Sequence, residues 1–152
     1  MFERNGMSTT LFKTVGIAGI GLIGGSLARD LRAMGLTQRL IGWNRTPARA
    51  ERALELGLVD ETVKTLDALV DGCDLIVLAT PVDVLVQTLP GVLDRLRPEQ
   101  IVIDVGSTKV ALTTAIAHHP KRKQFIACHP MAGTEKSGPD AAVDNLFRNR
   151  FC

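Results

Sequence analysis

Cysteine is scarce in this sequence and forms no recognisable pattern. Only three of the 152 residues are cysteines, Cys73, Cys128 and Cys152, and no two of them form a CxxC pair. An odd number of cysteines without metal-ligand spacing argues against both a disulfide framework and a zinc site. We therefore expect no bound metal and a reducing, cytoplasmic setting.

An excess of charge of one sign is also lacking. The chain has 18 basic and 16 acidic residues, a formal net charge of +2, and its basic residues are scattered. Binding to nucleic acid or to an anionic membrane surface needs a concentrated basic surface. We expect neither kind of partner.

Long apolar runs are missing as well. The run "TVGIAGIGLIGGSLA" follows Lys13 and imitates a signal peptide, but its five glycines make it a poor apolar helix. No other run approaches the ~18 residues of a membrane span. Residues 1–12 show no periodicity, so we expect a flexible N-terminal tail followed by one domain over residues 13–152.

The sequence does contain a regular alternation of strand-length apolar runs and helical patterns. Its 45% apolar and 22% charged residues are typical of one soluble globular domain. Strands are expected at 14–18, 39–43, 74–79, 100–105 and 124–128, with a short one at 59–63 and another opening in the final "NLFRNRFC". Helices are expected at 24–34, 46–56, 66–70, 82–96, 110–118 and 139–145. The alternation predicts a doubly wound α/β fold with a mainly parallel sheet and helices on both faces.

The first strand is followed by a glycine motif. Gly19, Gly21 and Gly24 stand in GxGxxG spacing between that strand and the first helix. In a Rossmann-like fold these glycines permit a tight turn, a close approach to a diphosphate and close helix packing. We expect them, with Leu22 and Ile23, to bind the diphosphate of a dinucleotide at the helix N-terminus. The alternative is a glycine-rich turn in an unrelated α/β domain.

The residues after the second strand discriminate between NAD and NADP. An acidic residue there would accept hydrogen bonds from the ribose 2′-hydroxyl, but this sequence has Asn44 followed by Arg45. Arg45 can bind a 2′-phosphate through charge-assisted hydrogen bonds, with Thr46 and Arg49 assisting. We predict a preference for NADP. The alternative is that Asn44 holds the ribose of NAD while Arg45 faces solvent.

Polar residues follow the three later long strands, and in a doubly wound sheet ligands bind at the carboxyl ends of the strands. Thr80 and Pro81 are expected to flank the cofactor, unless they only form the turn into the next helix. Ser107 can cap a helix and Lys109 can be merely solvated. His129 can be a structural residue, but an imidazole can also accept a proton near neutral pH.

Four segments become specific in combination: "GIGLIGGSLA", "ATPVDV", "DVGSTK" and "HPMAGTEKSGPDAA" with the later "NLF". Together they resemble the nucleotide-binding half of the prephenate and arogenate dehydrogenase family, the enzymes of tyrosine biosynthesis. The resemblance covers about residues 14–152, and the "HPMAGTEKSG" block is its most specific part. It implies an oxidoreductase that acts on prephenate or arogenate with NADP or NAD.

The resemblance also implies roles for individual residues. It implies an oxidative decarboxylation in which His129 accepts the proton of the ring hydroxyl and Ser107 hydrogen-bonds that hydroxyl. Thr134, Glu135 and Lys136 match a loop that lines the entrance of the site.

Family members continue into a helical domain that forms the dimer and contributes groups for the substrate carboxylates. This sequence stops at Cys152, so we expect a fragment or truncated domain that binds the cofactor and turns over weakly or not at all.

Two other functions stay open. A β-hydroxyacid dehydrogenase would fit "NRT" after the second strand, but that group uses a lysine from a helical domain not present here. A non-catalytic NADP-sensing module is the second possibility.

Overall fold

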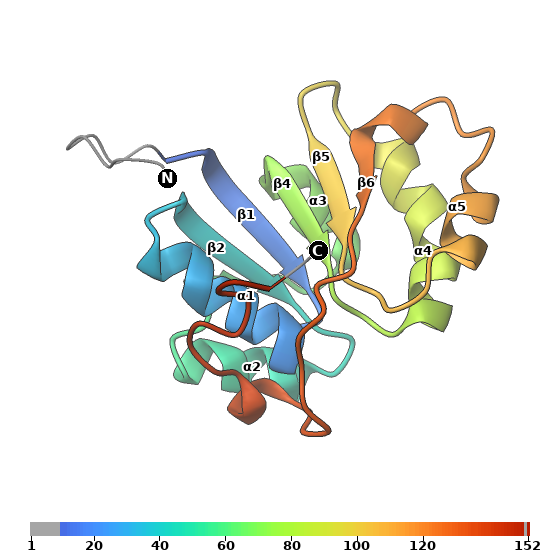
Figure 1. The fold of residues 1–152 in the computed structure, drawn as a ribbon. Helices are drawn as coiled ribbons and strands as arrows, with labels where there is room; N and C mark the ends of the chain where they lie inside the picture. Colours follow the sequence, from blue (N-terminus) through green and yellow to red (C-terminus); the bar gives the residue numbers. More distant parts are fainter. Residues whose placement is uncertain (1–9, 151) are drawn as a thin grey trace.

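A computed structural model of the protein describes residues 10–150 and 152, so most of the predicted N-terminal tail lies outside the described residues. Within these ranges six strands form one parallel sheet in the order β3-β2-β1-β4-β5-β6 (Figure 1). The strands are β1 (Phe12–Ala18), β2 (Thr37–Trp43), β3 (Glu61–Thr62), β4 (Leu75–Leu78), β5 (Ile101–Asp104) and β6 (Phe125–Ala127). The predicted doubly wound α/β fold is confirmed.

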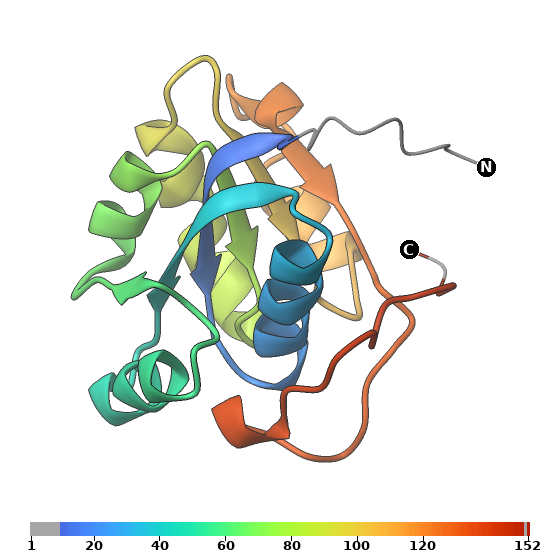
Figure 2. The same ribbon diagram turned by 90° about the vertical axis from the view of Figure 1, so that its left-hand side faces the viewer.

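Helices cover both faces of the sheet (Figures 1 and 2). They are α1 (Leu22–Ala33), α2 (Pro47–Glu55), α3 (Leu66–Gly72), α4 (Val82–Arg95) and α5 (Val110–Ala115), with 3-10 turns η1 (Arg122–Gln124) and η2 (Pro139–Ala141). The first two helices pack on one face, and α3, α4 and α5 pack on the other, which gives two apolar cores. All four residues of β4 are buried, as expected for a central strand of a parallel sheet.

Some predicted boundaries are wrong. The first helix begins at Leu22 rather than at residue 24, because the third glycine of the motif lies inside its first turn. The helix predicted over 110–118 ends at Ala115. The expected helix over 139–145 is only the 3-10 turn η2.

The final segment is not a strand as predicted. Residues 144–149 form turns, and Asn145 and Asn149 both have a φ of 58°, which extended backbone does not allow. Residues 139–149, here called the C-terminal strap, run back from the sheet edge onto α1 and α2 (Figure 2). The predicted strand was wrong because polar side chains of α1, more than 100 residues earlier in the sequence, accept hydrogen bonds from the backbone of this segment.

Side chains of α1 and α2 hold the strap in place. The hydroxyl of Ser26 accepts a hydrogen bond from the amide of Val143 (2.9 Å). The carboxylate of Asp30 accepts one from the amide of Asn145 (2.7 Å). Arg52 of α2 pairs with both carboxylate oxygens of Asp140. The loop between β6 and the strap therefore crosses the carboxyl edge of the sheet with both of its ends anchored.

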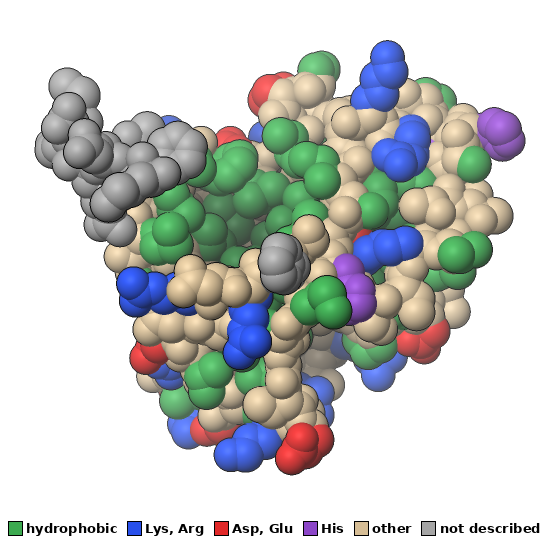
Figure 3. Space-filling view, in the orientation of Figure 1, with side chains coloured by type: hydrophobic (Ala, Val, Ile, Leu, Met, Phe, Trp, Pro, Cys, Tyr) green, Lys and Arg blue, Asp and Glu red, His purple; other side chains and the backbone are tan. Residues whose placement is uncertain are grey.

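The α1 face is open over β5 and β6. Ile101, Ile103 and Val105 are half-buried and Ile126 is 51% exposed on this side. Figure 3 shows the apolar side chains gathered in a hollow of this face. Each helix in the described part of the chain is too short or too polar to cross a membrane.

Candidate functional site

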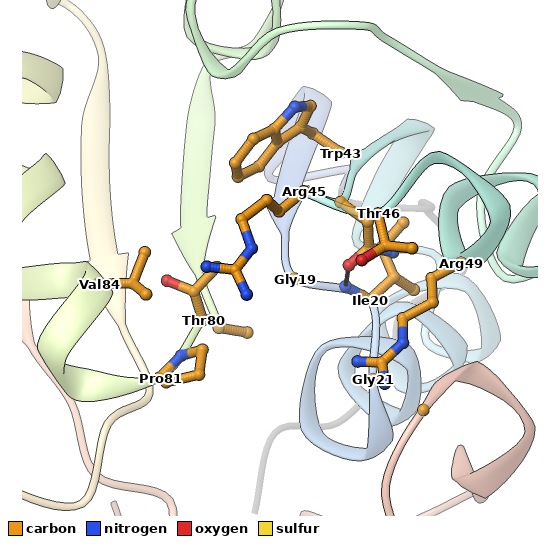
Figure 4. A pocket seen from close by; sticks show the side chains of 13 residues that line it. Gly19, Ile20, Gly21, Trp43, Arg45, Thr46, Arg49, Thr80, Pro81 and Val84 are labelled. Carbon is orange, nitrogen blue, oxygen red and sulfur yellow. Dashed lines mark hydrogen bonds between the residues drawn. The ribbon is translucent and has the colours of Figure 1, made fainter.

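A cavity of about 190 Å³ opens at the carboxyl edge of the sheet, between β1 and β4. The strand order reverses at this position, and doubly wound folds bind ligands at such a point. The cavity is lined by the loops that follow three adjacent strands (Figure 4): Gly19, Ile20, Gly21, Trp43, Asn44, Arg45, Thr46, Arg49, Ala79, Thr80, Pro81, Val84 and Gly138. Eight of the predicted cofactor residues are in this set.

Gly19 makes the tight turn that ends β1. Its φ is +92°, and a β-carbon built on it would lie 2.6 Å from the carbonyl oxygen of Ala79. Its amide donates a hydrogen bond to the carbonyl of Trp43 (2.8 Å). Only glycine fits here, because the loop is squeezed between the ends of β2 and β4.

The other two glycines of the motif have different surroundings. A β-carbon on Gly24 would lie 2.2 Å from the carbonyl oxygen of Gly19, so this glycine lets the helix pack against the loop. A β-carbon on Gly21 would meet nothing nearer than the amide nitrogen of Gly138, at 3.9 Å. The protein itself therefore leaves room at Gly21, which begins α1 without a side-chain cap. An anionic group can approach free amides there.

Asn44 follows β2 and reaches across to the glycine loop. Its Oδ1 accepts a hydrogen bond from the amide of Ile20 (3.0 Å). Its Nδ2 is buried and has no hydrogen-bond partner among the described residues. A buried donor without a partner costs free energy, and a ligand oxygen in the cavity would satisfy it.

The basic residues after β2 border the same cavity. Arg45, Thr46 and Arg49 are exposed, and the Thr46 hydroxyl makes no capping hydrogen bond to α2 although Thr46 precedes that helix. In Figure 4 the Arg45 guanidinium extends towards Thr80 and that of Arg49 towards Gly21. The carboxyl end of β2 thus presents two guanidinium groups and a hydroxyl to the cavity.

Thr80 and Pro81 border the cavity from the β4 side. Pro81 is also the residue before α4, so the predicted turn into a helix and the predicted position at the cavity are both present. Val84, from the first turn of α4, adds an apolar surface that the sequence did not single out.

Three predicted cofactor residues do not line the cavity. Leu22 is only 7% exposed and belongs to the core, and Gly24 packs beneath the loop. Ile23 instead faces the later loop, since a β-carbon on Gly133 would lie 3.5 Å from its Cδ1. These residues can still contribute to binding a diphosphate through the backbone amides of the first helical turn. That contribution stays a prediction.

Ser107 and His129 are both exposed, and neither lines the cavity. They follow β5 and β6, which pair in parallel with Asp104 opposite Ala127. The two residues are thus delivered to the same edge of the sheet as the cavity, and their catalytic roles stay predictions. The alternative role of Ser107 as a helix cap is wrong, because Lys109 occupies the cap position of α5.

Lys109 is not merely solvated, contrary to one expectation. Its Nζ pairs with the carboxylate of Asp104 and donates a hydrogen bond to the carbonyl of Gly106 (2.8 Å). Asp104 is a site residue that was not predicted, although an acidic residue at the end of the otherwise apolar run "IVID" was an available signal.

Thr134, Glu135 and Lys136 are exposed in the loop between β6 and the strap. The amide of Lys136 donates a hydrogen bond to the hydroxyl of Thr134 (3.2 Å), which makes a local turn. Gly138, from the same loop, does reach the cavity. The loop therefore borders the site, and the role of these three side chains at its entrance stays a prediction.

Cys128 directly precedes His129. The pKa of its thiol is raised to about 11, first by burial and then by a hydrogen bond with Cys152. The thiolate is the nucleophilic form, so this shift disfavours nucleophilic chemistry at the sulfur. No group of three or more potential metal ligands occurs in the described ranges.

Comparison with known proteins identifies relatives along most of the chain. A family model described as "Prephenate dehydrogenase, nucleotide-binding domain" matches residues 27–152. The prephenate dehydrogenase of Bacillus subtilis (strain 168) is 38% identical over 144 residues, which cover 91% of this chain and 38% of that protein.

Two solved structures share the fold at comparable identity. Synechocystis arogenate dehydrogenase superposes with a TM-score of 0.79 at 40% identity, covering 90% of this chain and 48% of that chain. A prephenate dehydrogenase from A. aeolicus, in complex with hydroxyphenyl propionate and NAD+, superposes with a TM-score of 0.75 at 31% identity, covering 91% and 48%. This chain spans less than half the length of each of the three proteins.

Proposed function

The chain belongs to the prephenate dehydrogenase family, whose nucleotide-binding domain it matches, and from this premise we propose that it serves the NADP- or NAD-dependent oxidative decarboxylation of prephenate or arogenate. The observation that carries the proposal is the extent of the family match, since residues 27–152 include both Ser107 and His129. The cavity at the strand-order reversal supports the cofactor half of the proposal.

The cavity fits a dinucleotide in three respects. Space is left at Gly21 where a diphosphate would approach the N-terminus of α1. The unpartnered Nδ2 of Asn44 supplies a buried donor for a ribose oxygen. Arg45 and Arg49 supply positive charge beside it.

NADP is the cofactor we propose. No carboxylate follows β2 to repel a 2′-phosphate, and Arg45 can bind that group with charge-assisted hydrogen bonds. The A. aeolicus relative was solved with NAD+, so the choice has to be measured for this protein.

His129 is proposed as the general base. It follows β6 at the edge where the cavity lies, and it is exposed, so a substrate can reach its imidazole. His129 would accept the proton of the ring hydroxyl while Ser107 hydrogen-bonds the same oxygen. A bound nicotinamide would supply the acceptor for the hydride of the hydroxyl-bearing carbon. Loss of the ring carboxylate as carbon dioxide would leave its electron pair to complete the aromatic ring.

Groups beyond this chain are proposed to complete the site. The two solved relatives are about twice as long as this chain. As the family resemblance implies, we propose that a further helical domain binds the substrate carboxylates and forms the dimer. We therefore propose that residues 13–152 bind the cofactor but turn over weakly by themselves. The apolar hollow over β5 and β6 (Figure 3) supports contact with additional polypeptide on this face.

The test is a steady-state assay of the natural full-length protein with prephenate and with arogenate, each with NADP+ and NAD+. His129→Asn is expected to lower turnover at least about 100-fold, a loss typical for a general base, while the Kd for the cofactor stays unchanged. The matched control is His118→Asn, an exposed histidine on the far loop, which should leave turnover unchanged.

Two results would overturn parts of the proposal. No turnover of either substrate by the full-length protein would refute the function. Undiminished turnover of His129→Asn would eliminate His129 as the base and favour a base outside this chain, as in β-hydroxyacid dehydrogenases.

A further inference from the structure

Asp104 is the last residue of β5, and its side chain is completely buried, with an exposed fraction of 0%. Aspartate is almost never fully buried unless its charge is paired and its oxygens are hydrogen-bonded. The groups that pair with this carboxylate therefore indicate its role.

Each carboxylate oxygen of Asp104 contacts a different loop. Oδ2 accepts a hydrogen bond from the amide of Gly106 (2.9 Å) and pairs with Nζ of Lys109. Oδ1 accepts a hydrogen bond from the amide of Cys128 (3.2 Å). Lys109 supplies the compensating charge and also binds the carbonyl of Gly106. One carboxylate thus joins the loop after β5 to the end of β6.

The two amides bound by Asp104 directly precede the two proposed catalytic residues. Gly106 is followed by Ser107, and Cys128 is followed by His129. The β5–β6 ladder ends with Asp104 opposite Ala127. Beyond that pair the carboxylate is the direct link between the two backbones, because it receives an amide from each.

We propose that Asp104, neutralised by Lys109, is a positioning residue that sets the separation of Ser107 and His129 for proton abstraction. The inference rests on the proposed function, since it acts through that function's two residues. A carboxylate can accept hydrogen bonds at both oxygens, whereas the isosteric asparagine has only one acceptor oxygen. Asp104→Asn must therefore release one of the two loops, with little change in side-chain volume.

The test is Asp104→Asn in the natural full-length protein, assayed well below its unfolding temperature. We expect kcat to fall about 10- to 100-fold, because small displacements of reacting groups have effects of that size. The Kd for the cofactor should be unchanged, because Asp104 does not line the cavity. The matched control is Asp60→Asn.

Asp60 is a suitable control because it makes the same kinds of contact elsewhere. Its carboxylate accepts the amide of Leu40 (2.7 Å) and pairs with Arg32 (2.9 Å) at the amino end of β3. Asp60→Asn should leave kcat unchanged.

A double-mutant cycle separates positioning from general support of the fold. If Asp104 acts through His129, then Asp104→Asn should cause little further loss in a His129→Asn background, because the group to be positioned is gone. If the residual turnover of His129→Asn is too low to measure, Ser107→Ala serves in the cycle. A purely structural Asp104 would give the same fold-loss in both backgrounds, which would overturn the inference.

Asp104→Asn can also fail to fold, because Lys109 would lose its counter-charge. In that case the pair Asp104→Asn with Lys109→Gln removes both charges and carries the same cycle. The inference fails alone if the wild type turns over, His129→Asn does not, and the Asp104 variant keeps full kcat. If the wild type turns over neither substrate, the inference and the proposed function both fail.

Discussion

The amide of Ile20 donates a hydrogen bond of 3.0 Å to Oδ1 of Asn44, and this contact joins the glycine loop after β1 to the end of β2. It orients the Asn44 side chain so that its Nδ2 is buried without a partner in the described part of the chain. The residue proposed to discriminate between cofactors is therefore held by the loop proposed to bind their diphosphate.

Asn44→Asp should reverse the proposed cofactor preference. The carboxylate can keep the hydrogen bond with Ile20, and its second oxygen would accept one from a ribose 2′-hydroxyl and repel a 2′-phosphate. We expect the ratio of Kd for NADP+ to Kd for NAD+ to rise at least about 10-fold, measured by titration calorimetry. Asn149→Asp adds the same charge on the exposed strap and should leave the ratio unchanged. An unchanged ratio in Asn44→Asp would place the ribose elsewhere.

Arg45→Gln should weaken the binding of NADP+ and have little effect on NAD+. Hydrogen bonds to a charged group contribute about 1.5–3 kcal/mol, which corresponds to about a 10- to 150-fold rise in the Kd for NADP+. The same titrations measure it. Arg148→Gln, an exposed arginine of the strap, is the control. Equal weakening of both cofactors would mean that Arg45 does not distinguish the 2′-phosphate.

Two glycine-to-alanine changes should separate binding from folding. Gly24→Ala forces a β-carbon to within 2.2 Å of a carbonyl oxygen, and we expect it to destabilise the domain by about 1–3 kcal/mol. Gly21→Ala meets no protein atom nearer than 3.9 Å, so its stability should be unchanged while its affinity for the cofactor is lost. Denaturant unfolding and cofactor titration measure the two effects.

Gly91→Ala is the control for these changes. No atom lies within 4 Å of the added methyl group in α4, and alanine in a helix interior should stabilise by about 0.5–1 kcal/mol. Normal cofactor binding by Gly21→Ala would show that no diphosphate passes over this glycine.

The attachment of the strap to α2 should depend on pH. Hydrogen bonds from Arg52 hold the pKa of Asp140 below its ordinary value. A carboxyl group whose pKa is lowered in the folded state stabilises that state fully above its unfolded pKa of about 3.9, and this stabilisation is lost as the pH falls through the lowered pKa of the folded state. Wild type should therefore be more stable than Asp140→Asn at pH 7, and the difference should be smaller at pH 3.

Urea unfolding at both pH values, in low salt, checks this expectation, because surface pairs are screened by salt. Glu51→Gln removes an exposed charge of α2 that forms no ion pair with other described residues, and it should show no such pH dependence. An undiminished difference at pH 3 would mean that Asp140 acts through something other than its charge.

Most of the sheet and its order of elements could be predicted from the sequence, because nearly continuous apolar runs such as Leu75–Leu78 occur only where helices cover both faces. The place of the cavity could also be predicted, because Gly19 and the residues that follow β2 are sequence motifs and both line it. The strap could not be predicted in this way. Its conformation depends on Ser26 and Asp30, more than 100 residues earlier, which accept hydrogen bonds from its amides.

By itself, the sequence determined the doubly wound fold, the glycine loop and the residue types brought to the carboxyl edge, since periodicity and turn chemistry are local properties. Only the tertiary structure decided that Asn44, beside the cavity, keeps a buried donor without a partner among the described residues, and that Asp104 joins the backbones before Ser107 and His129. The physical reason is that hydrogen bonds between residues far apart in sequence depend on strand register and burial. Neither quantity is encoded in any single segment.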